Sequence, residues 1–386
     1  MILIRNCRMI DPASGTDGLR DILTDGSRIA RIGAAGSIAV PDGDVRVIEA
    51  DGLAAAPGLV DTHVHFRDPG AEYKEDIFTG AKAAAAGGFT SVVLMANTTP
   101  HVDNEETLSY VTEKGKKTGI HVYTCANVTM DMAGDELTDM ETLAKAGAVG
   151  FTDDGKPLLD AGLARKAMQE AARLHMPISF HEENPAFIVN NGINAGAVSQ
   201  KLGLGGSDRQ AEIDMVRRDL SIALETGADI VIQHISAKEA VELVRQARRK
   251  SPRIHAEATP HHFTLTEEAV LEYGTLAKMN PPLRTKEDRE AISQGLKDGT
   301  LDLIATDHAP HAAEEKQKEF AKAPSGIIGL ETALPLGITQ LTDTGRLTLL
   351  ELLACMTVNP ARLYHLDAGY LAEDGPADLV LFDPKE

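Results

Sequence analysis

The sequence predicts a (β/α)8 barrel, an α/β fold, with a small β domain built from both chain ends. Three observations favour this fold: eight short apolar strand candidates follow residue 58, helix-like segments separate them, and a further strand candidate lies near the end of the sequence. The 386 residues include 43% hydrophobic and 25% charged residues, which is typical of a globular chain. A doubly wound open sheet is the competing architecture, and the absence of a GxGxxG turn after its first strand weakens it.

The first 57 residues are expected to form a small antiparallel β unit, because short β-rich runs alternate with glycine turns and no helical period appears. A last strand, Pro376–Phe382, is expected to return to this unit. The sequence therefore predicts a small β domain of residues 1–57 and 366–386, and a barrel domain of residues 58–365. The N-terminal strand candidates are Ile2–Ile4, Asp21–Thr24, Ile29–Ile32 and Val45–Ile48.

The eight barrel strands are predicted from continuous apolar runs, which suit a parallel sheet that is buried on both faces. They are Leu59–Phe66, Thr90–Ala96, His121–Asn127, Val149–Asp153, Pro177–Glu182, Asp229–Ile235, Arg253–Thr259 and Leu301–Thr306. Helices are expected between them. Apolar residues at helical spacing mark a helix after Asp160 and another after the sixth strand, where Ser236 and Glu239 match a capping box.

Charge and targeting features exclude several classes of protein. The net charge of −20 opposes binding to nucleic acid or to an anionic membrane surface. No apolar run reaches the roughly 18 residues of a membrane span, and Met1–Cys7 is too short for a secretion signal. The three cysteines form no CxxC pair, so we expect neither a disulfide framework nor a thiolate metal site, and we expect a cytoplasmic location.

Polar side chains gather where the predicted strands end, and barrel enzymes build their sites there. His63 and His65 are two residues apart on the first strand, so both point to one face and can converge on a metal ion. Buried groups of this kind need partners, so we interpret these strand ends as one shared metal centre. The other strands with such ends are the fourth (Asp153 and Asp154), the fifth (His181), the sixth (His234) and the eighth (Asp307).

The ligand types indicate the metal. Four histidines and two aspartates without a thiolate suit zinc better than manganese, cobalt or iron. Six ligands are more than one tetrahedral zinc ion needs. We therefore expect two zinc ions that share a bridging carboxylate and a bridging hydroxide.

Six segments carry a more specific signal. They are His63-Val-His-Phe-Arg67-Asp-Pro-Gly70, Met95-Ala-Asn97-Thr, Phe151-Thr-Asp-Asp-Gly155, Thr259-Pro-His-His262, Lys278-Met-Asn-Pro-Pro-Leu-Arg284 and Ala305-Thr-Asp-His-Ala-Pro-His311. Together, and in this order over nearly the whole chain, they resemble a dihydroorotase of the longer bacterial class (class I) in the amidohydrolase superfamily. Many amidohydrolases share the HxH pair, whereas FTDDG, KMNPPLR and ATDHAPH in series are far more specific.

The resemblance implies a role for each metal ligand. The first zinc ion would be bound by His63, His65 and Asp307, and the second by His181 and His234. Asp154 would bridge both ions, with Asp153 as the runner-up. Many relatives bridge with a carboxylated lysine instead, but here Lys156 lies beyond the glycine that follows the fourth strand.

The resemblance also implies the reaction, which is reversible hydrolysis of the cyclic amide of (S)-dihydroorotate to N-carbamoyl-L-aspartate in de novo pyrimidine biosynthesis. Asp307 would carry the proton from the hydroxide to the leaving ring nitrogen. Because the substrate is a carboxylate, Arg67 would pair with it bidentately, and a structural ion pair is the alternative for this arginine. The other implied substrate-binding residues are Asn97, Asn280, His311, Ser325 and Gly326.

Other features of the family are less regular here. His261 and His262 are expected to support the site without binding metal, and the stretch Ala309–Gly326 is the candidate lid. Ser325 stands where relatives often have phenylalanine, which affects packing around the substrate ring. Relatives usually continue with more β strands after the position of Glu386, so we expect a shortened chain.

Three alternatives stay open. The first is another cyclic amidohydrolase, such as a hydantoinase or allantoinase. The second is a non-catalytic dihydroorotase-like partner of aspartate transcarbamoylase, which would be expected to lose metal ligands. The third is an unrelated metal-binding protein. A homodimer and an aspartate transcarbamoylase partner are expected only by analogy with the family.

Overall fold

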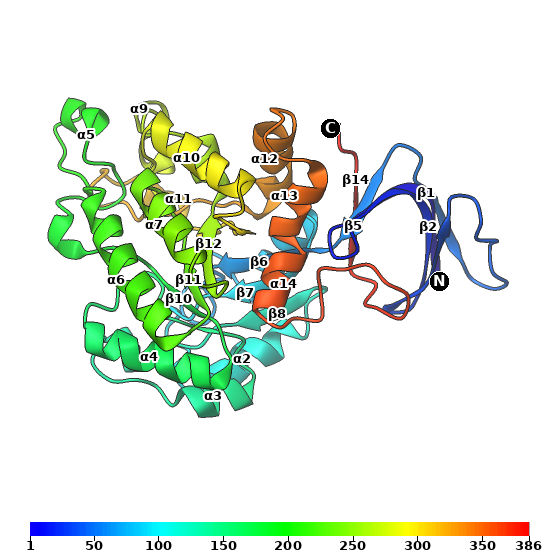
Figure 1. The fold of residues 1–386 in the computed structure, drawn as a ribbon, viewed down its shortest axis with the longest axis horizontal. Coiled ribbons are helices and arrows are strands. Elements are labelled where there is room, and N and C mark those ends of the chain that lie inside the picture. The colour runs from blue at the N-terminus through cyan, green and yellow to red at the C-terminus, as the bar shows by residue number, and fades with distance from the viewer. Residues whose placement is uncertain (386) are drawn as a thin grey trace.

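Eight parallel strands form a barrel within residues 1–385, the part of the chain that the computed structural model describes (Figure 1). Each strand lies inside or within one residue of the segment predicted for it, so the (β/α)8 prediction is confirmed. The strands are β6 (Leu59–Val64), β7 (Phe89–Leu94), β8 (His121–Thr124), β9 (Phe151–Thr152), β10 (Ile178–Phe180), β11 (Ile230–Ile232), β12 (Ile254–Ala258) and β13 (Leu303–Ile304).

The barrel closes through two seams between a three-stranded and a five-stranded sheet. At the first seam Ala126 bridges Phe151, so the end of β8 joins β9. At the second seam Val64 bridges His308, and the backbone N–H of His65 donates to the carbonyl of His308 at 2.8 Å. This second seam therefore fixes the HxH segment against the end of the eighth strand.

A principal helix follows each strand and covers the barrel. These helices are α1 (Ile77–Ala86), α2 (Glu105–Gly115), α3 (Met140–Ala146), α4 (Ala161–Leu174), α6 (Gln210–Thr226), α7 (Lys238–Arg248), α10 (Lys286–Lys297) and α13 (Leu349–Met356). Shorter helices are α5 (Ala197–Lys201), α8 (Pro260–Thr264), α9 (Ala269–Tyr273), α11 (Ala313–Lys316), α12 (Ala333–Gly337) and α14 (Val358–Leu363). Among residues 1–385, no helix combines the length and the apolar character that crossing a bilayer requires.

The predicted capping box before α7 is wrong, although the helix itself is present. The N-cap of α7 is Ala237, whose methyl side chain cannot accept a capping hydrogen bond. The hydroxyl of Ser236 instead hydrogen-bonds to the buried carboxylate of Glu212 and accepts from Arg284 at 2.7 Å. Glu239 pairs with Arg209 at 2.8 Å. Tertiary partners thus outcompete the local capping interaction that the sequence spacing favours.

A six-stranded sheet at one end of the molecule is built from both chain ends, as predicted (Figure 1). Its strands are β1 (Ile2–Asp11), β2 (Thr16–Asp25), β3 (Arg28–Ala34), β4 (Arg46–Glu49), β5 (Ala54–Pro57) and β14 (Leu379–Phe382). β14 pairs antiparallel with β5, with Leu379 opposite Pro57. The expectation of a purely antiparallel unit is wrong, because β4 and β5 both run parallel to β1 after the chain crosses back from β3.

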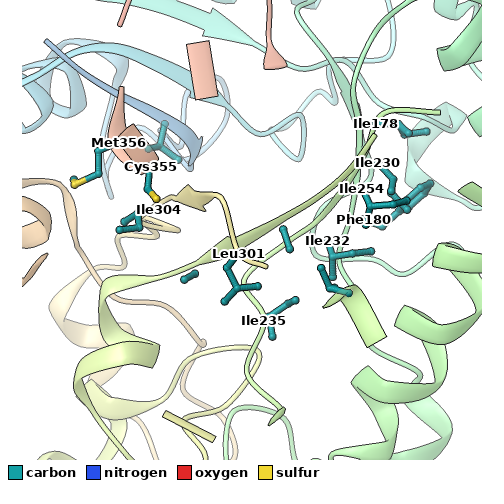
Figure 2. Packing of buried hydrophobic residues seen from close by; sticks show 14 of the residues in the cluster. Ile178, Phe180, Ile230, Ile232, Ile235, Ile254, Leu301, Ile304, Cys355 and Met356 are labelled. Atoms are coloured by element: carbon teal, nitrogen blue, oxygen red, sulfur yellow. The ribbon is translucent and has the colours of Figure 1, made fainter. Parts of the chain in front are cut away.

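The main core fills the space between the barrel and its helices. Figure 2 shows isoleucines from β10, β11 and β12 close together, with Cys355 and Met356 of α13 near Ile304 of β13. A fully buried side chain of this size stabilises the fold by roughly 1.5–3 kcal/mol. The β sheet has a separate small core around Cys7, Met9 and Ile22.

The ring of Phe66 connects this packing to the first strand end. Phe66 follows His65, is 1% exposed and lies against Gly80 in the middle of α1. A Cβ atom at position 80 would come within 2.3 Å of the Phe66 ring. The absence of a side chain at Gly80 therefore lets α1 approach the strand that carries the two histidines.

Gly80→Ala tests this close approach. Helix propensity alone would stabilise the variant by about 1 kcal/mol. Overpacking against a buried ring costs about 1–3 kcal/mol, so we expect net destabilisation, measured as a lower urea midpoint. Gly162→Ala, at an exposed position in α4, is the control: its Cβ would lie 3.1 Å from the exposed Asp160 carboxylate, which can shift, so the midpoint should change little. A stability gain in Gly80→Ala would contradict the packing described here.

Candidate active site

The predicted ligands come from five strand ends and meet at the carboxyl end of the barrel. Two of them have left-handed backbone conformations: φ is 29° at His234 and 48° at Asp307. Such conformations in non-glycine residues are strained, and they persist where the surrounding structure holds them. Here they lie directly after β11 and β13, where the chain turns out of the barrel wall.

Asp154 lies at the centre of four imidazoles. Its Oδ1 is 3.5 Å from His63 Nε2, 3.6 Å from His181 Nδ1 and 3.7 Å from His234 Nε2. Its Oδ2 is 3.3 Å from His65 Nε2. The structure therefore brings the predicted bridging residue within reach of all four predicted histidine ligands.

Asp307 lies on the side of His63 and His65. Its Oδ1 is 3.1 Å from His65 Nε2 and 3.5 Å from His63 Nε2. Two groups have ligand atoms that all lie within 4.8 Å of one another: His63, His65 and Asp307, and His63, Asp154 and His234. His181 lies beside the second group, with its Nδ1 2.9 Å from His234 Nε2.

Two polar atoms of this cluster lack hydrogen-bond partners among the described residues. His63 Nε2 and Asp154 Oδ1 are buried and make no hydrogen bond within residues 1–385. They face each other across 3.5 Å. Buried polar atoms are nearly always satisfied in native proteins, so an orphaned pair needs an explanation. A cation held between these donors would supply it, and the cluster fits a metal ion.

The electrostatics of the cluster keep its aspartates ionised. Burial raises the pKa of Asp154, but the nearby imidazoles of His63, His181 and His234 hold it well below its ordinary value. Burial also raises the pKa of Asp307, and the nearby His65 and His63 imidazoles lower it below its ordinary value. Ionised carboxylates are the form that binds a cation.

Two partners that the sequence analysis missed orient the ligands. Glu257, on β12 and fully buried, accepts from Nδ1 of His63 at 2.9 Å and from the backbone N–H of His234 at 3.3 Å. This bond places the proton on Nδ1 and leaves Nε2 of His63 facing the cluster. Glu183 lies 3.3 Å from Nε2 of His181, so that imidazole presents Nδ1 instead. A lone glutamate inside an apolar strand was the available signal for Glu257.

Asp153 points away from the cluster. Its Oδ1 accepts from the backbone N–H of Val128 at 2.9 Å and from the Asn127 amide at 3.2 Å, and both of its oxygens contact Thr129. The runner-up bridge therefore connects the end of β9 to the segment after β8. Lys156 also lies apart from the cluster, since its Nζ donates to the carbonyl of Met132 at 3.4 Å.

A cavity of about 180 Å³ opens beside the cluster. Every predicted site residue except His63 lines it, together with Gly155 and Ala309. His63 is instead fully buried behind the cavity wall. A larger hollow of about 540 Å³ lies beside the start of β8 and contains none of the predicted site residues.

Arg67 stands in this cavity as an uncompensated cation. Its Nε donates to the carbonyl of Pro310 at 3.2 Å, and within residues 1–385 no carboxylate oxygen lies within 4.0 Å of its guanidinium. Burial lowers the pKa of Arg67, although Asp307 and Asp154 raise it in part. A structural ion pair, the alternative considered for Arg67, is therefore absent from the described chain.

The two asparagines also reach both the ligands and the cavity. Asn97 accepts from Nδ1 of His65 at 3.1 Å and donates to the carbonyl of Asp154 at 3.1 Å. The amide nitrogen of Asn280 donates to Glu183 at 2.7 Å, while its Oδ1 is buried without a hydrogen-bond partner among the described residues. Asn280 Oδ1 is thus a free acceptor at the cavity.

His311 is oriented by the segment that follows it. Its Nε2 donates to the carbonyl of Ser325 at 2.8 Å, and Lys74 approaches its Nδ1 at 3.4 Å. Burial, and then the charge of Arg67, lower the pKa of His311 to about 4, so the imidazole is neutral near pH 7. A Cβ atom on Gly326 would lie 2.9 Å from this ring, so glycine permits the close approach.

The adjacent pair after β12 makes other contacts. His262 hydrogen-bonds through Nδ1 to Thr259 at 2.7 Å and through Nε2 to the carbonyl of Pro281 at 3.1 Å. Burial lowers the pKa of His261 to about 4. Neither residue belongs to a metal-binding group found within residues 1–385, and their supporting role stays a prediction.

Comparison with known proteins adds to this geometry. A family model described as dihydro-orotase-like matches residues 52–240. Dihydroorotase of Clostridioides difficile (strain 630) is 54% identical over 386 residues, which is 100% of this chain and 91% of the relative. Dihydroorotase of Lactococcus lactis subsp. lactis (strain IL1403) is 52% identical over 382 residues, covering 99% of this chain and 89% of the relative. The chain belongs to the dihydroorotase family. The third alternative, an unrelated metal-binding protein, is therefore wrong.

Solved structures support the fold more broadly. L-hydantoinase (dihydropyrimidinase) from Arthrobacter aurescens superposes with a TM-score of 0.86 at 26% identity, covering 98% of this chain and 86% of that one. D-hydantoinase from Thermus sp. has a TM-score of 0.84 at 25% identity, covering 100% and 87%. These proteins share the architecture with this chain, whereas the dihydroorotases share about half of its residues.

Substitution of the two adjacent aspartates separates their roles. Asp154→Asn should remove most bound zinc, because it takes a charge from the centre of the imidazole cluster. Asp153→Asn should retain zinc and lose about 1–3 kcal/mol of unfolding free energy, because it weakens acceptors of buried backbone donors. Metal analysis by mass spectrometry and urea unfolding measure the two effects. The reverse pattern would assign the metal-binding role to Asp153.

Proposed function

We propose that the chain is a zinc-dependent dihydroorotase, which reversibly hydrolyses the cyclic amide of (S)-dihydroorotate to N-carbamoyl-L-aspartate in de novo pyrimidine biosynthesis. One observation carries the proposal. A buried His/Asp cluster, in which two polar atoms lack hydrogen-bond partners among the described residues, borders a cavity of about 180 Å³. An arginine without an acidic partner lines the same cavity. The cluster suits hydrolysis of an amide, and the free guanidinium suits a substrate that is a carboxylate.

Two zinc ions would account for the six ligands. His63, His65 and Asp307 would hold one ion, His181 and His234 the other, and Asp154 together with a hydroxide would bridge them. Bound zinc supplies a hydroxide nucleophile near neutral pH and polarises the carbonyl of the substrate. The orientation of His63 by Glu257 and of His65 by Asn97 keeps their Nε2 atoms available as ligands.

Asp307 is the residue proposed to move the proton. It lies at the edge of the cluster, lines the cavity and is 3.1 Å from Nε2 of His65. From this place it would take a proton from the attacking hydroxide and give it to the ring nitrogen that leaves. The lowered pKa of its carboxylate keeps Asp307 ionised near neutral pH, which is the form that can take up a proton.

The rest of the cavity would orient the substrate. Arg67 would pair with the carboxylate, and Asn97 would add a hydrogen bond at that end. Asn280, with its free Oδ1, would accept from the ring N–H. His311 would complete the carboxylate end, and the backbone at Ser325 and Gly326 would lie along the ring.

Further proposals concern the domain boundaries, the cellular location and the partners of the chain. We propose that residues 1–57 and 366–386 form one domain and residues 58–365 the other, since the small sheet has a core of its own. A cytoplasmic location agrees with three buried, unpaired cysteines among the described residues. The homodimer and the aspartate transcarbamoylase partner stay predictions.

Turnover of L-dihydroorotate by the zinc-loaded protein tests the function. Activity should disappear in a chelated sample and return when zinc is added, because the nucleophile depends on the metal. Hydantoin and allantoin are the control substrates, and both should be turned over at least 100-fold more slowly, about 2.7 kcal/mol of discrimination. Preferred turnover of hydantoin would favour the hydantoinase alternative. A zinc-loaded protein that turns over none of the three would favour the non-catalytic partner.

Arg67→Met should weaken substrate binding without removing metal. Loss of a charge-assisted pair costs about 1.5–3 kcal/mol, which is roughly a 10- to 150-fold rise in KM. Zinc content should stay at the wild-type value, because Arg67 makes no hydrogen bond to any of the residues proposed to bind zinc. An equal loss of zinc would show instead that Arg67 supports the metal site.

A further inference from the structure

Two lysines near the cavity lack acidic partners. Within residues 1–385, no carboxylate oxygen lies within 4.0 Å of the ammonium of Lys278 or of Lys316. Lys278 belongs to the KMNPPLR segment and is 4% exposed. Lys316 ends α11, in the stretch that the sequence analysis considered as a lid. Lys316 is half-buried. An ammonium group that is removed from water needs other hydrogen-bond partners, so the contacts of both lysines call for an explanation.

Both ammonium groups donate to the backbone of one segment, residues 316–326, which we call the pocket wall. Lys316 Nζ donates to the carbonyls of Gly326 at 2.8 Å, Pro324 at 3.1 Å and Lys278 at 3.3 Å. Lys278 Nζ donates to the carbonyls of Phe320 and Ala323, each at 2.7 Å. Five carbonyl contacts thus tie the wall and its neighbour Lys278 together.

Further bonds hold the same segment against neighbouring loops. The backbone N–H of Gly326 donates to the carbonyl of Lys278 at 2.9 Å, and the Thr275 hydroxyl donates to the carbonyl of Lys316. The hydroxyl of Ser325 donates to Asn191 at 2.7 Å. The pocket wall is therefore held against its neighbours by several hydrogen bonds in this structure, and a lid role for the stretch Ala309–Gly326 stays a prediction.

The pocket wall also contacts His311, at the end of the cavity that is proposed to bind the substrate carboxylate. The Ser325 carbonyl accepts from Nε2 of His311 at 2.8 Å, which sets the orientation of that imidazole. Nε2 of His311 in turn lies 3.5 Å from the Arg67 guanidinium. Contacts therefore run continuously from the two ammonium groups, through the Ser325 carbonyl, to the groups that face the substrate.

We propose that Lys278 and Lys316 are positioning residues, which pin the pocket wall so that Ser325 holds His311 beside Arg67 for an anionic substrate. This inference rests on the proposed function, because it concerns the carboxylate end of the same cavity. Neither lysine touches the metal cluster through a hydrogen bond. Their loss should therefore affect substrate binding more than metal binding or the chemical step.

Lys316→Met tests the proposal, with Lys322→Met as the matched control. Lys322 lies in the same segment but is exposed and pairs with Glu319 at 2.9 Å. Lys316→Met should raise KM for dihydroorotate about tenfold, keep kcat within about twofold and keep wild-type zinc content. Lys322→Met should match the wild type. A KM within twofold of wild type, or parallel loss of zinc and kcat, would overturn the proposal.

A double-mutant cycle shows whether Lys316 acts through His311. In a His311→Ala background, Lys316→Met should change KM by less than twofold, because the oriented group is already absent. If the two substitutions raise KM independently, so that their fold-changes multiply, Lys316 does not act on His311 through Ser325. If Lys316→Met does not fold, Lys278→Met is measured in the same cycle with the same expectations.

Amide hydrogen exchange tests the pinning without any substrate. In Lys316→Met the peptide spanning residues 316–326 should exchange at least tenfold faster than in the wild type, and in Lys322→Met it should not. Unchanged exchange in Lys316→Met would overturn the pinning. Because this readout needs no turnover, it separates failure of the inference from failure of the proposed function, which would appear as inactivity of the wild-type enzyme.

Discussion

The burial of one carboxylate among four imidazoles is the constraint on which the rest of the site depends. Asp154 is 3% exposed, and an ionised carboxylate at that depth is stable only if positive charge or hydrogen bonds compensate it. The imidazoles of His63, His65, His181 and His234 surround it at 3.3–3.7 Å, so a cation bound between them and the carboxylate would supply that compensation. Their own second nitrogens need partners in turn, and Glu257, Asn97 and Glu183 meet that need for three of them. Asp154 is thus surrounded first by the imidazoles and then by the side chains that orient them.

The fold separates this cluster from the groups that would recognise the substrate. The cluster comes from strand ends, which the barrel and its helices hold rigidly, whereas the carboxylate end comes from the segments after β6 and β13. Those segments are less regular, so they need other means of support. Arg67 is held through the carbonyl of Pro310, and His311 through the carbonyl of Ser325. Backbone carbonyls, rather than acidic side chains, therefore hold the cationic end, and the cavity keeps unpaired positive charge for an anionic ligand.

The parts of the structure that were predictable from sequence are those with local patterns. Apolar runs marked all eight barrel strands, and the polar residues directly after them, such as His181 and Asp307, identified the cluster. β5 was missed because its sequence is Ala-Ala-Ala-Pro, and alanine has little preference for strands. The parallel pairing of β4 and β5 with β1, and the contacts of Ser236 with Glu212 and Arg284, depend on residues distant in sequence. The role of Glu257 escaped notice for the same reason, since its partners His63 and His234 lie after other strands. The contacts of Lys278 with Phe320 and Ala323 also join residues distant in sequence.

The central claim is that this cluster holds two zinc ions with Asp154 between them. Crystals of the zinc-loaded protein, measured at the zinc absorption edge, test it most directly. We expect two anomalous peaks, one bounded by His63, His65 and Asp307 and the other by His181 and His234, with the Asp154 carboxylate contacting both. A single peak, or a peak contacting Asp153 in place of Asp154, would show that the proposed zinc pair is wrong.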